Sequence, residues 1–390
     1  MFYLWLTWLV SPLLRCIAGR APAEPQRILV IQMAKIGDLL CATPVFREIK
    51  ARYPQAHLAV MATAQNVPLL RTNLRVDEVI VAEAKTFRGL GGKWRLICLL
   101  RQGHYDTVVC LNAVAAYAVA ALWALIPRRL AVQSNFGGAS HRLAARLWSE
   151  VELHRGDRLI QETYLALLSR LGIAGGHVDK EVFAVAGAEA KVDVLLGVQL
   201  GGLLGELNHG QVSVPLIGIG VSSANRLKAL GDEKIIAIAR RLLVVRPTAR
   251  LVLIGSADDK SEALSIAAQL PAAAVINACG TLGIAELPTL LQRLTVFIGV
   301  DSGVTYMADA VNTPIVSVAG PVDMQETRPL GDHVIILQRT DLPCAPCSHT
   351  FNAPYTCRVG TRACIEGIDA RQIADAALAL CDDPSEISAP

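Results

Sequence analysis

Short apolar runs alternate along the chain with longer segments in which apolar and polar positions repeat at helical spacing. The first run, at 28–31, has the length and β-branched content of a buried parallel strand, and 39–53 has the pattern of the helix that follows it. Between them the pattern breaks at Lys35, Gly37 and Asp38, where Gly37 is expected to form a tight turn. These residues would lie at the carboxyl end of the first strand, where open α/β sheets bind ligands.

The same alternation predicts two further groups of elements. In the first half it predicts strands at 57–61, 78–81 and 107–111, and helices at 113–125 and 158–171. In the second half it predicts strands at 215–219, 250–254, 296–298 and 314–318, and helices at 233–244, 260–269 and 284–294. Strands that alternate with helices are typical of βαβ units with a parallel sheet. We therefore predict an α/β protein with two Rossmann-like domains that face each other across a cleft.

A glycine-rich stretch of weak periodicity separates the two groups and marks the expected domain boundary. The predicted organisation is an N-terminal tail and linker at 1–26, a first domain at 27–185, a linker at 186–212, a second domain at 213–367, and a last helix with a tail at 368–390. A chain of 390 residues is long enough for two domains with separate cores. Its net charge of +3 gives no indication of nucleic-acid binding.

The N-terminal segment 1–17 is apolar and aromatic, but a serine–proline pair interrupts it. A membrane-spanning helix needs about 20 apolar residues, and no basic residue precedes the run as it would in an export signal. We predict a short helix in the membrane interface, with Trp5 and Trp8 at headgroup level and Arg15 and Arg20 on the phosphates. The alternative is a helix that packs on the protein itself. Without an export signal, a cytoplasmic location and reduced cysteines are expected.

The second domain carries the pattern of a phosphate site. Asp301, Ser302 and Gly303 follow an apolar strand and precede a helix, whose first amides and dipole would attract an anion. A simple helix N-cap is the alternative interpretation. Lys228 lies in another loop that follows a strand, together with Ser222, and could reach a diphosphate.

A third loop of the second domain offers two adjacent carboxylates. Asp258 or Asp259 could accept hydrogen bonds from the hydroxyl groups of a ribose. Together the three loops predict a site for a nucleoside diphosphate.

An ordered set of segments resembles glycosyltransferase family 9, the heptosyltransferase type with GT-B architecture. The matching segments include KIGDLLCATPVFREIKARYPQAHL, YDTVVCLN, LKALGDEKIIAIARRL, LVLIGSADD, the stretch from GTLGIAELP to SVAGP, and a cysteine-rich end. The resemblance covers residues 27–380 and keeps the order and spacing of the segments. It implies that the first domain binds the acceptor, that the second binds a nucleotide-sugar, and that the last helix returns to the first domain.

The resemblance also implies a role for each matching residue. Asp38 would be the general base that deprotonates the acceptor hydroxyl as the sugar is attacked with inversion. Lys228 would stabilise the departing diphosphate, with no metal and no other cofactor. The residues expected to bind the nucleotide-sugar are Lys35, Gly37, Ser222, Asp258, Asp301, Ser302, Gly303 and Tyr306.

The implied reaction is the transfer of a sugar from a nucleotide-sugar, with ADP-heptose as the leading donor. The expected acceptor is the lipopolysaccharide core or another lipid-linked glycan, and the enzyme would be peripheral on the cytoplasmic face of the inner membrane. The alternatives are a catalytically degenerate sugar-nucleotide-binding partner protein and, less favoured, a sugar-nucleotide epimerase.

The chain departs from the family pattern at three places. Ala34 and Lys35 stand where serine or threonine is common, Tyr306 replaces a histidine, and Leu230 with the following glycine replaces Trp-Pro. Lys35 is expected to direct positive charge toward the diphosphate, whereas a phenol at Tyr306 donates a hydrogen bond but carries no charge. These departures motivate the degenerate-binder alternative.

Four cysteines near the end of the chain raise the question of a metal site. Cys344, Cys347, Cys357 and Cys364 begin with a C-x-x-C spacing and have His349 nearby, a pattern that could hold zinc. A second C-x-x-C pair is missing, so we favour reduced structural cysteines over zinc.

Overall fold

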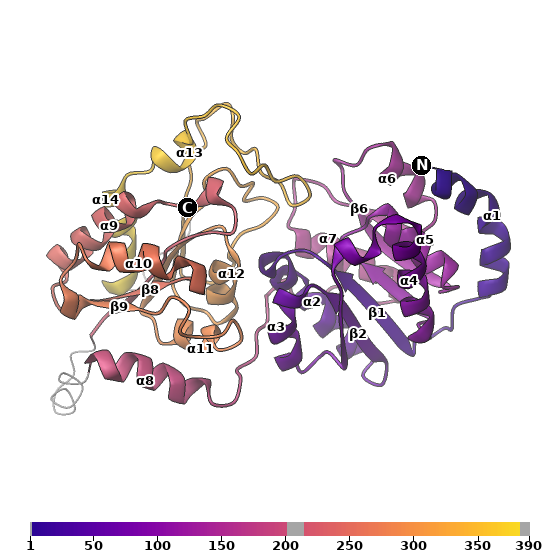
Figure 1. The fold of residues 1–390 in the computed structure, drawn as a ribbon, viewed down its shortest axis with the longest axis horizontal. Helices are drawn as coiled ribbons and strands as arrows, with labels where there is room; N and C mark the ends of the chain where they lie inside the picture. Colours follow the sequence, from indigo (N-terminus) through magenta and orange to yellow (C-terminus); the bar gives the residue numbers. More distant parts are fainter. Residues whose placement is uncertain (1, 201–213, 383–390) are drawn as a thin grey trace. The chain divides into compact units, whose positions relative to one another are not determined.

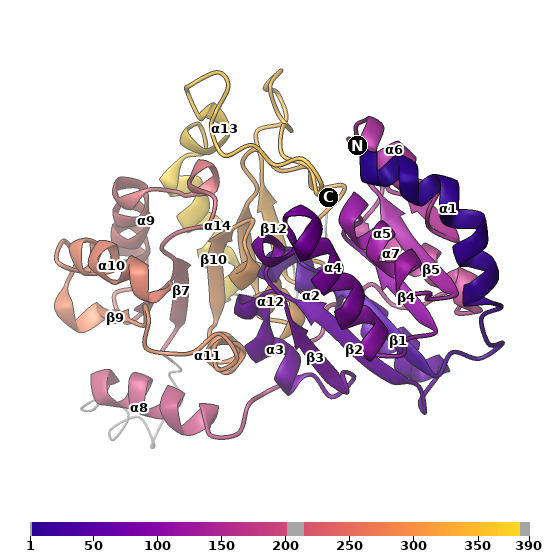
Figure 2. The ribbon, with the colours of Figure 1, turned by 45° about the vertical axis from the view of Figure 1, so that its right-hand side comes forward.

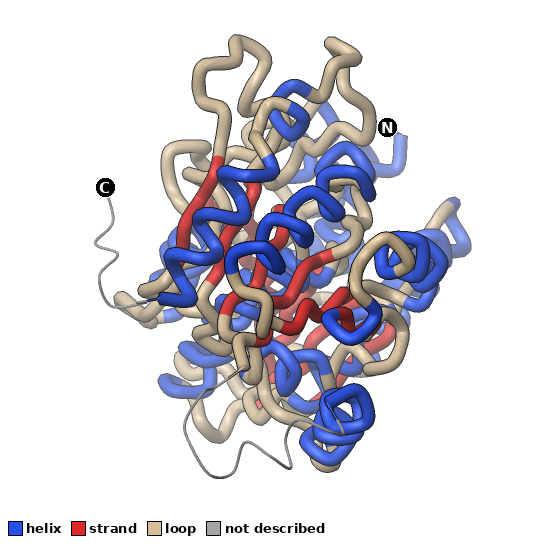
Figure 3. Tube along the Cα trace, turned by 90° about the vertical axis from the view of Figure 1, so that its left-hand side faces the viewer, coloured by secondary structure: helices blue, strands red, loops and turns tan. Residues whose placement is uncertain are grey.

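The computed structural model describes residues 2–200 and 214–382, which form two compact units, Met1–Glu181 and Val182–Pro390 (Figure 1). Three segments lie outside the described residues: Met1, residues 201–213 and the tail from 383 onward. The second of these includes the end of the predicted linker, 201–212. Within each unit the strands lie between helices (Figure 3).

Unit 1 contains a six-stranded parallel sheet of order β3-β2-β1-β4-β5-β6. Its strands are β1 (Arg27–Gln32), β2 (His57–Ala62), β3 (Glu78–Val81), β4 (Thr107–Cys110), β5 (Arg128–Gln133) and β6 (Glu150–Leu153). This is the Rossmann order, in which the chain changes direction between β1 and β4. The predictions of β1, β2, β3 and β4 are confirmed to within one residue at each end. Strands β5 and β6 were not predicted.

Helices cover both faces of this sheet. They are α2 (Ile36–Arg52), α3 (Val67–Thr72), α4 (Gly89–Gln102), α5 (Ala115–Trp123), α6 (Ala139–Ala145) and α7 (Ile160–Leu168). Leu29 and Ile31 of β1 share a buried cluster with α4 and α5. Helices α2 and α7 pack against each other. The sheet therefore holds the carboxyl end of β1 and the start of α2 in a rigid frame.

The predicted N-terminal helix is present as α1 (Phe2–Ala18), which packs on α5 and α6 (Figures 1 and 2). Leu4 and Leu14 are buried in the same cluster as α4 and α5, and the Trp123 indole donates a hydrogen bond to Thr7. One face of α1 thus packs on the protein, as the alternative interpretation expected. Its other face is exposed and apolar, and none of the helices in the described residues is long and apolar enough to cross a membrane.

Unit 2 repeats the architecture with a second six-stranded parallel sheet, of order β12-β11-β10-β7-β8-β9. Its strands are β7 (Leu216–Gly220), β8 (Arg250–Ile254), β9 (Val275–Asn277), β10 (Val296–Val300), β11 (Ile315–Val318) and β12 (Val334–Leu337). The order matches that of unit 1, and the chain changes direction between β7 and β10. At such a switch point, the loops that follow two neighbouring strands diverge and leave room for a ligand.

The helices of unit 2 include one in the segment that was predicted to be a linker. They are α8 (Ala188–Leu200), α9 (Asp232–Val245), α10 (Lys260–Ala267), α11 (Leu287–Gln292), α12 (Gly303–Ala310), α13 (Ala363–Glu366) and α14 (Ala370–Asp382). The predicted linker contains α8, which packs on α11 and belongs to unit 2. Helix α14 packs on α9, β10 and β11 within unit 2, where Ile373 and Ala377 are part of that unit's core.

Candidate active site

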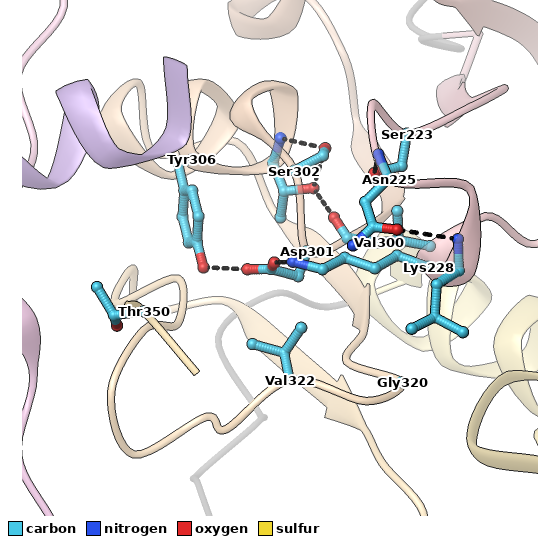
Figure 4. Close-up of polar contacts among 12 residues, drawn as sticks. Ser223, Asn225, Lys228, Val300, Asp301, Ser302, Tyr306, Gly320, Val322 and Thr350 are labelled. Carbon is cyan, nitrogen blue, oxygen red and sulfur yellow. Dashed lines mark hydrogen bonds and ion pairs between the residues drawn. The ribbon is translucent and has the colours of Figure 1, made fainter. Parts of the chain in front are cut away.

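Three polar side chains meet at the switch point of unit 2. The ammonium of Lys228 donates to Oδ2 of Asp301, and the hydroxyl of Tyr306 donates to Oδ1 of the same carboxylate (Figure 4). Lys228 follows β7, Asp301 follows β10, and Tyr306 lies on α12. The structure therefore brings together three of the residues predicted from the sequence.

The start of α12 lies beside this group. Ser302 is the N-cap residue, and its Oγ accepts a hydrogen bond from the amide of Thr305. The N-cap interpretation of Ser302 is therefore confirmed. The amides of Gly303 and Val304 stand at the first helical positions, where an α-helix offers N–H groups that have no partner within the helix. An anion could bind these amides with the help of the helix dipole.

A short turn fixes the position of Lys228. The 3-10 turn Arg226–Lys228 is capped by Asn225, whose Oδ1 accepts from the amide of Leu227 at 3.2 Å. The amide group of the Asn225 side chain also donates to the Pro354 carbonyl at 2.8 Å. Asn225 is only 5% exposed, so it anchors the turn that carries the lysine. Its position in a loop directly before a turn is the sequence signal that could have identified it.

The family's Trp-Pro is replaced here by residues that suit a different local backbone. Leu230 is buried in the core of unit 2, and Gly231 has a φ of 87° at the start of α9. Proline is locked near a φ of −65° and could not adopt this conformation. The backbone at the entry into α9 therefore suits glycine, and the turn that carries Lys228 is formed directly before it.

The loops after β7 and β8 are tied together by Asp259. Its carboxylate accepts from Ser222 Oγ at 2.6 Å, from Ser256 Oγ at 2.6 Å and from the Ser256 amide at 2.7 Å. Burial alone would raise the pKa of Asp259, but the hydrogen bonds from Ser222 and Ser256 outweigh it and hold the pKa below its ordinary value. Asp259 is thus a structural anchor, and the neighbouring Asp258 is exposed.

The predicted residues of unit 1 lie at the carboxyl end of β1. Asp38 is half-buried in the first turn of α2, and its Oδ2 accepts from the amide of Lys35 at 3.2 Å. The prediction that Gly37 forms a tight turn is wrong, because α2 begins at Ile36 and Gly37 is its second residue. The turn comes earlier because the carboxylate of Asp38 caps the amide at the start of the helix.

A buried phenol lies near Asp38. Burial raises the pKa of Tyr164 well above its ordinary value, and the charge of Asp38 raises it further. The amide nitrogen of Gln32 lies 3.2 Å from the Asp38 carbonyl and 3.5 Å from the Tyr164 hydroxyl. The backbone around Asp38 is therefore held by buried polar contacts, which sequence reasoning did not identify.

One group in the described residues has ligand atoms close enough together for a metal ion, and it is not the cysteine group. Asp323, Glu326 and His349 place one ligand atom each within 4.8 Å of one another. Nδ1 of His349 lies 2.9 Å from Glu326 and 3.5 Å from Asp323, distances that also suit an ion pair.

The four cysteines of the C-terminal region are free and unevenly exposed. Cys344 is exposed, Cys347 and Cys357 are half-buried, and Cys364 is buried. Hydrogen bonds from backbone amides that follow it in the chain, first that of Arg362 and then those of residues 359–361, hold the pKa of Cys357 below its ordinary value.

Comparisons with known proteins agree with this geometry. The model of glycosyltransferase family 9 (heptosyltransferase) matches residues 208–355, which include Lys228, Asp301 and Tyr306. The chain is therefore similar to glycosyltransferase family 9 over the residues that carry this site. Lipopolysaccharide heptosyltransferase 3 of Escherichia coli K12 is 25% identical over 302 residues, which are 77% of this chain and 84% of that protein. Lipopolysaccharide heptosyltransferase 2 of the same strain is 27% identical over 324 residues, which are 80% and 88% of the two chains.

Solved structures of family 9 proteins share the fold. The E. coli ADP-heptose lipopolysaccharide heptosyltransferase II aligns with a TM-score of 0.69 at 22% identity and covers 91% of this chain and 98% of that one. The family 9 glycosyltransferase of Veillonella parvula aligns with a TM-score of 0.70 at 19% identity, with 91% and 97% covered. These matches and the two Rossmann-like sheets confirm the predicted GT-B fold class.

Proposed function

We propose that this protein is an inverting glycosyltransferase that moves a heptose from ADP-heptose onto the lipopolysaccharide core or another lipid-linked glycan. The family match and the names of its relatives support the reaction class and the donor. The observation that carries the proposal is the convergence of the Lys228 ammonium and the start of α12 at the switch point between β7 and β10.

The hydrogen-bond donors at this point of unit 2 are suited to bind a diphosphate. The ammonium of Lys228 has three N–H donors, and Asp301 takes one of them. The amides of Gly303 and Val304 add two neutral donors at the positive end of the helix dipole. Asp258, which is exposed in the loop after β8, is the carboxylate proposed to bind the ribose, because Asp259 already binds two serines.

The proposed reaction has a simple balance of bonds. The acceptor hydroxyl oxygen attacks the anomeric carbon, and the bond from that carbon to the phosphate oxygen breaks on the opposite face. The hydroxyl proton passes to the carboxylate of Asp38, and ADP leaves with the electron pair of the broken bond. Lys228 and the first amides of α12 stabilise the negative charge that develops on the diphosphate.

The exposed face of α1 supports a location on the cytoplasmic side of the inner membrane, as a peripheral protein. Its exposed large apolar side chains are Trp5, Leu6, Trp8, Leu9, Leu13 and Ile17. Lys93 of α4 lies over the Tyr3 ring at 4.5 Å, and Leu90 and Trp94 of α4 are also exposed. Aromatic side chains beside basic ones are typical of helices that lie in a membrane interface.

The charged residues of α1 and of the segment that contains α4 have one sign. Residues 1–23 and 84–105 contain no acidic residue, and their basic residues are Arg15, Arg20, Lys85, Arg88, Lys93, Arg95 and Arg101. Such a surface complements anionic lipid headgroups. It would keep the enzyme in the plane where a lipid-linked acceptor lies.

The test is a transfer assay with the full-length protein. Purified protein is incubated with ADP-heptose and a lipopolysaccharide acceptor that lacks its outer heptoses, and products are followed by mass spectrometry and by release of ADP. We expect the acceptor to gain one heptose, with no transfer from UDP-, GDP- or dTDP-sugars. Binding of ADP without transfer to any truncated acceptor would instead support a sugar-nucleotide-binding partner protein.

A further inference from the structure

The carboxylate of Asp301 is shared between two donors from different elements. Oδ2 accepts from the ammonium of Lys228, and Oδ1 accepts from the hydroxyl of Tyr306 (Figure 4). Each carboxylate oxygen thus has its own hydrogen-bond donor. The lysine comes from the loop after β7 and the tyrosine from α12, so the carboxylate links two elements of the sheet edge.

All three groups are largely shielded from water. Tyr306 is 4% exposed, and the side chains of Asp301 and Lys228 are 10% and 14% exposed. Hydrogen bonds that involve charged groups are stronger in such surroundings than in water. Tyr306 was predicted from the sequence to bind the nucleotide-sugar directly. Its burial and its bond to Asp301 point to an indirect role.

We propose that Tyr306 is a positioning residue, which acts through Asp301 to hold the ammonium of Lys228 beside the start of α12. The phenol fixes Oδ1 and so sets the plane of the carboxylate, which leaves Oδ2 alone to hold the lysine. It also draws some negative charge away from Oδ2, so the ammonium keeps more of its attraction for an anion. This inference rests on the proposed role of Lys228 toward the diphosphate.

Removal of the hydroxyl would release the carboxylate. In Tyr306→Phe the ring still fills its buried site, but Oδ1 loses its donor and can turn toward Lys228. The ammonium would then be held by both oxygens and drawn away from the ligand. We expect the affinity for ADP to fall several-fold and kcat to fall about tenfold, because a charge-stabilising donor is misplaced in the transition state.

The test is a double-mutant cycle with Tyr306→Phe, Asp301→Asn and the combination of both. If Tyr306 acts through Asp301, the tyrosine change should cost little once Asp301→Asn is present, within about a factor of two. Losses that multiply in the double variant would overturn the proposal. Tyr53→Phe is the matched control, because Tyr53 is also buried and its hydroxyl donates to the Leu171 carbonyl in unit 1. It should lower the melting temperature without changing the affinity for ADP.

Two readouts separate this inference from the proposed function. The cycle is measured both for ADP binding by calorimetry and for heptosyl transfer. If the wild-type protein transfers no heptose, the proposed function fails, and the cycle on ADP affinity still decides the role of Tyr306. If ADP affinity and transfer are both unchanged in Tyr306→Phe, the positioning role is refuted while the transferase activity stands.

Discussion

The exposed face of α1 predicts how strongly the protein binds a bilayer. Leu9 and Leu13 are 68% and 63% exposed, although both lie on a helix whose other face is buried. Full burial of a leucine side chain is worth about 1.5–3 kcal/mol. About two-thirds of that area is still available in each, so each leucine would contribute about 1–2 kcal/mol on entry into the interface.

The variant Leu9→Ser with Leu13→Ser should therefore lose about 2–4 kcal/mol of binding free energy, or about 30- to 700-fold in affinity. The assay is cosedimentation with vesicles of phosphatidylethanolamine with and without phosphatidylglycerol. Binding of the wild type should need the anionic lipid and should weaken as salt is raised, because the basic residues beside α1 supply part of the attraction.

The matched control replaces two exposed leucines elsewhere, Leu74→Ser with Leu264→Ser, which are 83% and 54% exposed. Both double variants should unfold within a few degrees of the wild type, because surface substitutions rarely change stability by more than about 0.5 kcal/mol. Equal vesicle binding by the wild type and the Leu9/Leu13 variant would refute the reasoning, as would a wild type that does not bind anionic vesicles.

Three further predictions concern the site. Asp38→Asn should lower kcat by about 10²–10⁴ and leave ADP affinity unchanged, measured by ADP release and calorimetry, since it removes a base and no proposed ligand of the nucleotide. The folded-state pKa of Asp259 is below its unfolded value, so its contribution to stability is present above that value and lost as pH falls through the folded pKa. Ser222→Ala should therefore unfold at a higher pH in an acid titration followed by circular dichroism, and an unshifted midpoint would contradict this account. Dialysis against EDTA should leave the transfer rate within about a factor of two, because Lys228 and the start of α12 supply the positive charge; a loss restored by a divalent metal would contradict it.

The central strands could be predicted because each is a run of apolar residues that are adjacent in the sequence. Strands β1, β8 and β10 are continuous buried apolar runs, and such runs are visible in the sequence. The strands that were missed lie toward the sheet edges. Strand β9 has only three residues and leaves no clear pattern, whereas β12 is a short apolar run that was visible in the sequence but was not assigned as a strand. Their place depends on pairing with neighbours that are distant in the chain.

Two helices depend on tertiary contacts that the sequence does not show. Helix α8 lies in a stretch whose apolar residues are spread around the helix, and it is held by contacts with α11 and by an ion pair between Arg293 and Asp193 at 3.1 Å. Helix α14 has a clear amphipathic pattern, but the pattern does not say which domain buries it.

The sequence predicted which residues lie at the site, but not which of them bind one another. The sequence placed Lys228 and Asp301 at strand ends, where ligands bind. It did not show that they bind each other, that Tyr306 completes the group, or that Asp259 is occupied by Ser222. The spacing of Ser256 and Asp259 is a capping pattern, which could have assigned the structural role to Asp259 in advance.

The pair of Lys228 and Asp301 has a consequence for how the protein acquires its ligand. The two residues are 73 positions apart, and they meet only because β10 pairs directly with β7, although β8 and β9 lie between them in the chain. No partly folded chain that lacks β10 can form the pair. A ligand that needs both the lysine and the start of α12 can therefore bind only after β10 has joined the sheet and α12 has formed. During synthesis, donor binding would stabilise the second unit only after its fourth strand has been inserted.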